Sequence, residues 1–201
     1  MYKRKITFLL FTFTVAFLLC VGTFTGLEVR AQEYDEAESL APFVPTPMHV
    51  VEKMLELAEV TKNDVVYDLG CGDGRIVVMA AEKYGARGVG VDYNPVRIAE
   101  ARELVKEKKV EKLVKIIQAD AMTVDLSEAT VVTLYLLASS NVKLRPILEK
   151  YLKPGARVVS HDFDMQGWEA KKVVEINNDD EYYGHTVYLW IIGEQKPESE
   201  K

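Results

Sequence analysis

Residues 68–74 contain an aspartate and a glycine-rich loop whose residue types suit the binding of a ligand. The glycines occupy alternating positions, Gly70, Gly72 and Gly74. One apolar run, residues 65–67, precedes the loop and a second, residues 76–81, follows it. Repeated glycines between a buried strand and a buried helix indicate that a ligand approaches the backbone, because a tight turn alone usually needs one glycine. We therefore expect the loop at the carboxyl end of a strand, where open α/β sheets bind ligands.

Asp68 and Arg75 distinguish this loop from a dinucleotide-binding loop. The dinucleotide pattern is G-x-G-x-x-G, in which the third glycine lets the helix pack close to the strand. Here Arg75 takes the sixth position, and the third glycine comes one position early. Asp68, two residues before the first glycine, would repel a pyrophosphate and attract an ammonium group. The ligand is therefore expected to carry a positive charge beside Asp68.

Two further aspartates are expected at strand ends. Asp92 ends a second apolar strand, and Asn94 and Pro95 follow as the N-cap and first-turn proline of a helix. Asp120 ends a third apolar strand. Each aspartate alone could cap a helix or lie in a solvated turn, but three acids at three successive strand ends favour one shared site. Asp92 is placed to accept hydrogen bonds from two ribose hydroxyls, as an acidic residue does in dinucleotide folds.

The segment DLGCGDG, residues 68–74, resembles the first motif of the class I methyltransferases that use S-adenosylmethionine. The resemblance implies that Asp68 holds the methionyl ammonium group and that the glycine loop passes under the nucleoside. It also implies that Asp120 binds the exocyclic amine of adenine, with Ala121 or Met122 beside the ring. The residues predicted to bind this cofactor are Thr46, Asp68, Gly70, Cys71, Gly72, Gly74, Asp92, Tyr93, Asp120 and Ala121.

Four further segments resemble a narrower group of enzymes. These enzymes are small bacterial relatives of the lysine methyltransferases that modify mitochondrial inner-membrane proteins, namely the ATP synthase c-subunit and the adenine nucleotide translocase. The segments are APFVPTP (41–47), ATVVTLYLL (129–137), NVKLRP (141–146) and LKPGARVVSHDFDM (152–165). The resemblance spans residues 41–192 and implies that the first segment folds over the cofactor and helps to form the acceptor channel. Ala138 departs from the pattern, because a proline is expected after Tyr-Leu-Leu.

The methyl acceptor is expected at the carboxyl ends of the fourth and fifth strands. The residues predicted to bind it are Phe43, Pro45, Ser139, Asn141, His161 and Trp168. Tyr135 and Asp162 are the predicted catalytic residues, since a lysine with a pKa of about 10.4 is almost fully protonated at pH 7 and must lose a proton before it reacts. Structural alternatives stay open: Tyr135 in the core, His161 and Asp162 in a capped connection, and Trp168 over a sheet edge.

Residues 1–31 differ in composition from the rest of the chain. Basic residues at positions 3–5 precede an uncharged run, residues 6–27, and residues 29–31 (Val-Arg-Ala) suit signal-peptidase cleavage. The run exceeds a usual signal core of about 7–15 residues and reaches the ~20 needed to span a bilayer. A signal peptide or a membrane anchor is therefore expected, and with it a membrane-anchored or exported protein. The charge pattern places the domain outside the cytoplasm, whereas S-adenosylmethionine is made inside it.

Alternating strand and helix patterns predict an α/β fold. The expected class is Rossmann-like and doubly wound, with a mostly parallel seven-stranded sheet and a C-terminal antiparallel hairpin. Thr46 and Pro47 are expected to cap and open one helix, and another is expected to begin near Leu144 with Pro146 in its first turn. The expected parts are an acidic linker (32–41), the methyltransferase domain (42–193) and a disordered tail (194–201).

Composition narrows the choice of acceptor. The formal net charge of −6 disfavours nucleic acid, and neither cysteine has metal-ligand spacing, so no metal is predicted. We expect methyl transfer from S-adenosylmethionine to a lysine of a protein substrate, with integral membrane proteins among the candidates. Two alternatives stay open: a methyltransferase for a quinone or lipid precursor at the membrane, and a non-catalytic exported module that binds a nucleoside. The sequence predicts no oligomeric state.

Overall fold

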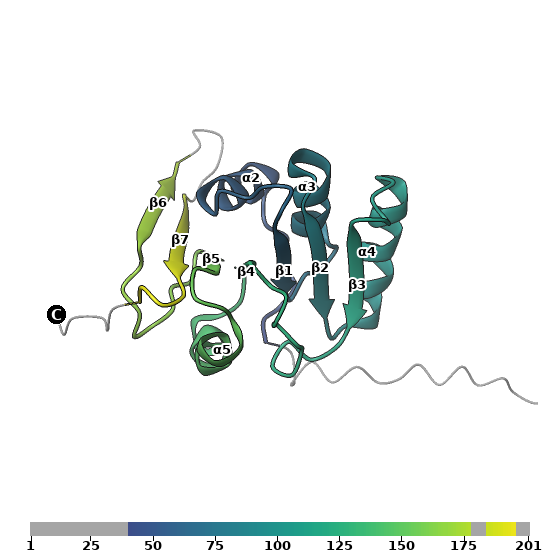
Figure 1. Ribbon diagram of the computed structural model, residues 1–201. Helices are drawn as coiled ribbons and strands as arrows, with labels where there is room; N and C mark the ends of the chain where they lie inside the picture. The colour runs from purple at the N-terminus through teal and green to yellow at the C-terminus, as the bar shows by residue number, and fades with distance from the viewer. Residues whose placement is uncertain (1–39, 178–183, 196–201) are drawn as a thin grey trace, which may run out of the picture. The chain divides into compact units, whose positions relative to one another are not determined.

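The computed structural model describes residues 40–177 and 184–195, which form one α/β sheet structure (Figure 1). The strands are β1 (Val65–Leu69), β2 (Arg87–Asp92), β3 (Val114–Gln118), β4 (Val131–Leu134), β5 (Arg157–His161), β6 (Lys172–Ile176) and β7 (His185–Ile191). The helices are α2 (Met48–Leu57), α3 (Arg75–Tyr84), α4 (Pro95–Glu107) and α5 (Ala138–Tyr151). The strand order is β3-β2-β1-β4-β5-β7-β6. Strand β7 is antiparallel to β5 and β6, and the other pairs are parallel, so the predicted fold class is confirmed.

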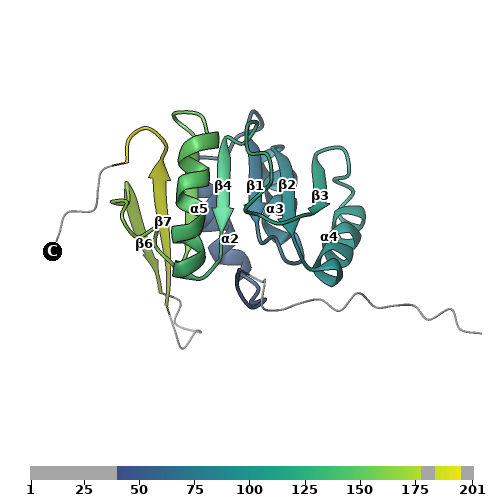
Figure 2. The same cartoon turned by 90° about the horizontal axis from the view of Figure 1, so that it is seen from below.

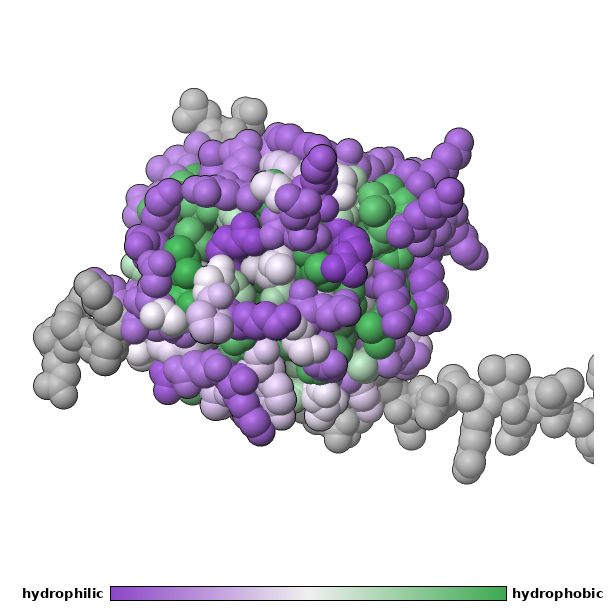
Figure 3. Space-filling model, viewed as in Figure 1, coloured by the Kyte–Doolittle hydropathy of each residue, from purple (hydrophilic) through white to green (hydrophobic). Residues whose placement is uncertain are grey.

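Helices cover both faces of the sheet (Figures 1 and 2). Helices α2, α3 and α4 pack on one face and α5 on the other. Strand β1 shows how the sequence dictates this: Val66 packs with α2 and α3, whereas Leu69 packs with α5. Because side chains alternate along a strand, an apolar strand supplies two cores. Figure 3 shows the side of the molecule seen in Figure 1 as mostly hydrophilic, with hydrophobic patches between the polar residues.

Helix starts show where local sequence rules hold and where they fail. Asn94 caps α4, because its Oδ1 accepts the Val96 N–H at 2.8 Å, and this prediction is confirmed. The predicted cap of α2 is wrong: Pro47 takes the N-cap position, and the Thr46 side chain makes no capping hydrogen bond. The expected start near Leu144 is also wrong. Helix α5 begins six residues earlier, at Ala138, and carries Pro146 in its interior.

The predicted signal peptide or membrane anchor, residues 1–31, lies outside the described residues, as do most of the linker and the tail. Among the helices that the structure describes, none has the length and apolar character needed to cross a membrane. The expectation of a membrane-anchored or exported protein is therefore corrected, because no described part of the fold supports it.

Candidate active site

The glycine loop joins β1 to α3 at the carboxyl end of the sheet. Its glycines have positive φ angles of 81°, 52° and 80°, which favour residues without a Cβ atom. The N–H groups of Gly70 and Cys71 both donate to the Val91 carbonyl, at 2.8 and 2.9 Å, and attach the loop to β2. A Cβ atom on Gly72 would lie 2.4 Å from the ring of Phe43. The aromatic ring thus lies directly against the loop backbone, which brings residues 41–47 next to the glycine loop.

Asp68 is a buried acid at the end of β1, only 2% exposed. The hydroxyl of Thr133, its register partner on β4, donates a hydrogen bond to Oδ1 at 2.7 Å. Burial raises the pKa of Asp68 to about 7; the Thr133 hydrogen bond opposes this rise, and the negative charges of Asp92 and Asp73 add to it. A cationic ligand group would favour the ionised carboxylate here. Sequence reasoning missed Thr133, although it is a polar residue in an otherwise apolar strand.

Asp92 ends β2, the strand next to β1. Its Oδ2 accepts the Gly72 N–H at 2.9 Å, and its Oδ1 accepts the Asn94 N–H at 2.8 Å. Burial raises the pKa of Asp92, although these two hydrogen bonds act against the rise. The carboxylate therefore connects the glycine loop to the start of α4, with its oxygens fixed in direction by two backbone donors.

The remaining predicted cofactor residues lie along the same edge of the sheet. Asp120 is exposed beyond β3, and its Oδ1 accepts the Met122 N–H at 2.8 Å in a turn. Ala121 is buried beside it, whereas Tyr93, after β2, is 41% exposed. Because β3, β2 and β1 are neighbours in the sheet, the acids at positions 68, 92 and 120 follow one another along its carboxyl edge.

Arg75 attaches residues 41–47, the segment before α2, to the glycine loop. Its Nε donates to Asp73 at 2.9 Å, and its Nη1 donates to the Thr46 carbonyl at 2.8 Å. The guanidinium of Arg97 lies 4.3 Å from the centre of the Phe43 ring and holds that ring from α4. The sequence indicates Arg75 only as a departure from the dinucleotide pattern; its contact with Thr46 joins segments too distant for a local motif to reveal.

Tyr135, His161 and Thr46 come together on the acceptor side. The ring centres of Tyr135, just after β4, and His161, at the end of β5, lie 3.9 Å apart. His161 is fully buried, with its Nδ1 3.2 Å from the Thr46 hydroxyl. Burial lowers the pKa of His161 to about 4, so the ring is neutral near pH 7. Burial, with a contribution from the charge of Asp162, raises the pKa of Tyr135, which therefore keeps its proton.

Other predicted acceptor residues have different surroundings. Ser139 is exposed in the first turn of α5, and Pro45 is exposed beside Phe43. Asn141 is fully buried, and its Nδ2 donates to the carbonyls of Phe163 and Asp164 at 3.1 and 3.0 Å. Asn141 therefore fixes the loop after β5.

Trp168 and Asp162 also form contacts within the fold. Trp168 is 7% exposed, and its indole N–H donates to Glu149 at 2.9 Å, which favours a packing role over the predicted contact with substrate. The Asp162 carboxylate lies beside two histidines, His161 and His185. His185 is a neighbour that the sequence did not reveal.

Comparison with known proteins is consistent with this geometry. A family model described as "ANTKMT methyltransferase domain" matches residues 68–172. The chain belongs to the ANTKMT methyltransferase family. This ANTKMT-family chain is 49% identical over 156 residues to a protein-lysine N-methyltransferase of Saccharolobus islandicus, covering 77% of this chain and 96% of the relative. It is 30% identical over 132 residues to the human ATP synthase c-subunit lysine N-methyltransferase, covering 66% of this chain and 56% of the relative.

A solved structure that matches over nearly all of its own chain supports the cofactor assignment for the ANTKMT-family chain. It is a Salinibacter ruber protein described as an RNA methyltransferase, in complex with S-adenosyl-L-homocysteine. The two chains are 54% identical with a TM-score of 0.71, over 77% of this chain and 97% of the other. The chain is an S-adenosylmethionine-dependent methyltransferase, as the DLGCGDG motif predicts. The alternative of a non-catalytic module is not supported.

Proposed function

We propose that this enzyme transfers the methyl group of S-adenosylmethionine to the side-chain amine of a protein lysine. The observation that carries the proposal is the 49% identity to the Saccharolobus islandicus protein-lysine N-methyltransferase, 96% of which is covered by the match. The net charge of −6 supports a protein over a nucleic acid as the acceptor.

The residues at the carboxyl edge of the sheet fit the cofactor. Asp68 would hold its ammonium group, because a buried carboxylate with a raised pKa is complemented by a cation. Asp92, already oriented by two backbone donors, would accept hydrogen bonds from the ribose hydroxyls. Gly72 has a positive φ and no side chain, and the Phe43 ring lies against it, so a bound cofactor would be in contact with both the loop and this ring. S-adenosylmethionine supplies a methyl group activated by its sulfonium, so the protein mainly has to align it with the acceptor and exclude water.

Replacing Asp92 with alanine is expected to weaken cofactor binding by about 1–3 kcal/mol, through the loss of hydrogen bonds to ribose hydroxyls. Calorimetric titration with S-adenosylhomocysteine measures the change. Asp92→Asn is the matched control, because its carbonyl oxygen keeps part of the acceptor function and can still receive the Gly72 N–H. An unchanged dissociation constant for a folded Asp92→Ala protein would contradict the assignment.

On the acceptor side, Tyr135 is the residue proposed to orient the lysine amine. It follows β4 at the carboxyl edge, and the buried, neutral His161 ring supports one face of its phenol. A protonated phenol can donate or accept one hydrogen bond without adding charge next to the cationic cofactor. The Thr46 hydroxyl contacts His161. It therefore links the packed rings of His161 and Tyr135 to residues 41–47, the segment proposed to fold over the cofactor.

Tyr135→Phe is expected to lower the turnover rate by about tenfold or more while changing the affinity for S-adenosylhomocysteine much less. The wild-type rate should rise about tenfold per pH unit below the lysine pKa, because only the neutral amine attacks. Single-turnover transfer of labelled methyl groups, measured across pH, tests both statements. A variant that loses thermal stability but keeps its rate per folded molecule would show that Tyr135 has only a packing role.

The acceptor class can be tested by labelling. The enzyme is incubated with radiolabelled S-adenosylmethionine and with separate protein, RNA and lipid fractions of cells, and excess S-adenosylhomocysteine provides the inhibited control. We expect label in protein, and methyl-lysine after acid hydrolysis. Label in RNA would match the description of the Salinibacter ruber relative and overturn the lysine proposal. Label in lipid or quinone would favour the small-molecule alternative.

A further inference from the structure

All three histidines of the chain lie together at one place in the fold. His49 comes from α2, His161 from the end of β5 and His185 from the start of β7. The ring centres of His161 and His185 are 4.8 Å apart, and those of His49 and His185 are 6.0 Å apart. Methyl transfer as proposed above makes no direct use of His49 or His185.

Two of these histidines and Asp162 bring three possible metal ligands into one small triangle. His161 Nε2 lies 2.9 Å from His185 Nδ1. The Asp162 Oδ2 atom lies 3.2 Å from the first nitrogen and 3.3 Å from the second. In a tetrahedral zinc site with bonds of about 2.0–2.1 Å, neighbouring ligand atoms are about 3.3 Å apart. The three atoms therefore have nearly the spacing that such a site requires.

Outer contacts orient two of the three groups. The Thr46 hydroxyl lies 3.2 Å from His161 Nδ1, so an N–H at Nδ1 can donate to it and leave the lone pair of Nε2 inside the triangle. Asp162 Oδ1 accepts the Thr186 N–H at 2.8 Å, which leaves Oδ2 directed at the histidines. Metal-binding histidines and carboxylates in proteins commonly have such outer hydrogen bonds.

The backbone of Asp162 is held in a rare conformation. Its φ of +58° is in the left-handed region, which residues other than glycine seldom occupy and which recurs at functional sites. Its N–H donates to the Thr186 carbonyl at 2.7 Å, so the β5–β7 pairing maintains this conformation. The result is that the carboxylate points back at His161 and His185.

We propose that His161, Asp162 and His185 form a binding site for one late first-row divalent cation, of which Zn²⁺ is the representative. Two neutral imidazoles and one carboxylate are a donor set that suits zinc and its neighbours and does not suit Mg²⁺. A bound ion would link β5 to β7 beneath Tyr135 and fix His161 in the tautomer that donates to Thr46. The proposal is independent of the methyl acceptor.

Calorimetric titration of the full chain, carrying no polyhistidine tag and freed of metal by a chelator, tests the site. We expect one Zn²⁺ per chain and no measurable binding of Mg²⁺. Thr46→Val should weaken Zn²⁺ binding by about 10–100-fold through the lost outer hydrogen bond, and His185→Ala should weaken it further. Circular dichroism and a wild-type urea-unfolding midpoint in the absence of metal establish that each variant is folded.

His49→Gln is the matched control, because His49 belongs to the same cluster but lies outside the triangle. It should change the Zn²⁺ dissociation constant less than Thr46→Val does. If His49→Gln abolishes binding as fully as His185→Ala, the ligand set is wrong. Failure of the wild-type chain to bind at millimolar Zn²⁺ would show that the three groups are only a hydrogen-bonded network, and it would overturn the proposal.

Discussion

Replacing Asp68 with asparagine should weaken the binding of S-adenosylhomocysteine by about 1.5–3 kcal/mol at neutral to mildly alkaline pH, roughly 10–150-fold. Asparagine has nearly the same shape and can still accept the Thr133 hydrogen bond, but it carries no charge to pair with the ligand ammonium. The loss is expected to be large because Asp68 is 2% exposed, so water cannot take the place of the missing charge. Calorimetry on both proteins measures the difference.

The pH dependence provides an internal check. Because the pKa of Asp68 is raised to about 7, its carboxyl group is largely protonated in the free enzyme below that pH. A ligand cation that prefers the ionised form should therefore bind about tenfold more weakly for each pH unit below 7. The Asp68→Asn profile should be flat over the same range. A wild-type affinity that does not change between mildly acidic and neutral pH would contradict the assigned role of Asp68.

Thr133→Val is the matched variant for this experiment. Its hydroxyl donates to the Asp68 carboxylate and lowers the pKa of that acid. Removing it should shift the wild-type affinity profile toward higher pH without flattening it. A profile that does not shift in this variant would place the titrating group elsewhere.

In the cofactor-free enzyme the same pKa shift acts on stability. The folded-state pKa of Asp68 lies above its ordinary value of 3.8, so the folded state binds the proton more tightly than the unfolded state. The resulting stabilisation is complete below about pH 3.8 and is lost as the pH rises through about 7. Near pH 8 the free energy of unfolding of cofactor-free Asp68→Asn should therefore exceed that of the wild type. Urea unfolding with and without S-adenosylhomocysteine measures this difference.

The sheet and the cofactor edge could be predicted because their signals are local. A glycine loop between apolar runs, with an aspartate at each of three strand ends, needs only neighbouring residues to be recognised. The partner of Asp68 could not be predicted in this way, because Thr133 becomes its neighbour only through the pairing of β1 with β4. The contact of Arg75 with Thr46 is non-local for the same reason.

Local sequence rules could not reveal several contacts for one physical reason: the side chains bind residues that are far away in the sequence. Thr46 has the residue type of a helix cap, yet its hydroxyl contacts His161, which is 115 positions away in the sequence. Asn141, a predicted substrate contact, also donates from its Nδ2 to two loop carbonyls, a structural contact that no local pattern indicates. The histidine cluster shows the same limit, since its members come from α2, β5 and β7 and have no recognisable spacing.

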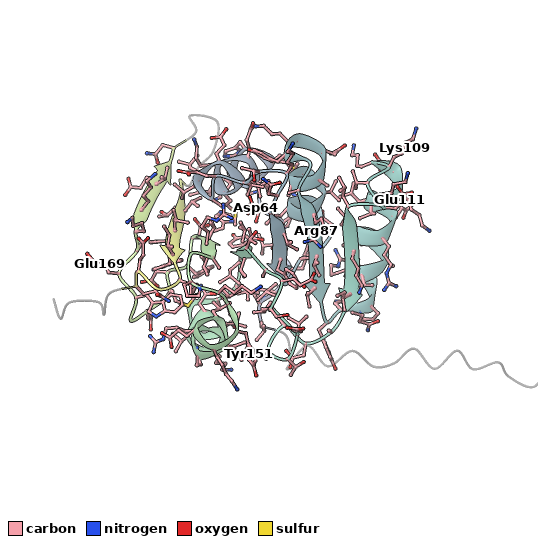
Figure 4. All side chains as sticks on the ribbon, in the orientation of Figure 1. Asp64, Arg87, Lys109, Glu111, Tyr151 and Glu169 are labelled. Atoms are coloured by element: carbon pink, nitrogen blue, oxygen red, sulfur yellow. The ribbon has the colours of Figure 1, made fainter. Side chains whose placement is uncertain are left out.

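Asp64 contrasts with Asp68 at the other end of β1. Figure 4 shows Asp64 and Arg87 toward the starts of β1 and β2, away from the arrowheads that mark the carboxyl edge. Asp64 Oδ1 accepts hydrogen bonds from the Thr130 hydroxyl at 2.7 Å and from the Arg157 guanidinium. Its Oδ2 accepts the Thr61 N–H at 2.7 Å. The carboxylate therefore joins β1, β4 and β5 at the end of the sheet remote from the chemistry.

Asp64→Ala is expected to lower the free energy of unfolding by about 3 kcal/mol at neutral pH, because it leaves the partly buried Arg157 without its carboxylate. Burial alone would raise the pKa of Asp64, but hydrogen bonds from Thr130, Thr61 and Arg157 outweigh it and lower the pKa below 3.8. The stabilisation by Asp64 is therefore present above about pH 3.8 and is lost as the pH falls through its lowered folded-state pKa. The stabilisation by Asp68 has the opposite pH dependence. Urea unfolding at several pH values measures both effects.

Further variants separate the stability loss of Asp64→Ala from a general loss of charge, and a binding measurement separates it from damage to the cofactor site. Glu194→Ala removes an ion pair with Lys171 in which both side chains are about half exposed, and it should cost less than about 1 kcal/mol. Arg157→Met should cost less stability than Asp64→Ala, because Asp64 keeps its hydrogen bonds to the two threonines, and the double variant should cost less than the sum of the single ones.

The affinity of folded Asp64→Ala for S-adenosylhomocysteine should equal that of the wild type, because the lost contacts lie at the opposite end of the sheet from Asp68. A weakened affinity with unchanged stability would reverse the roles assigned to the two aspartates.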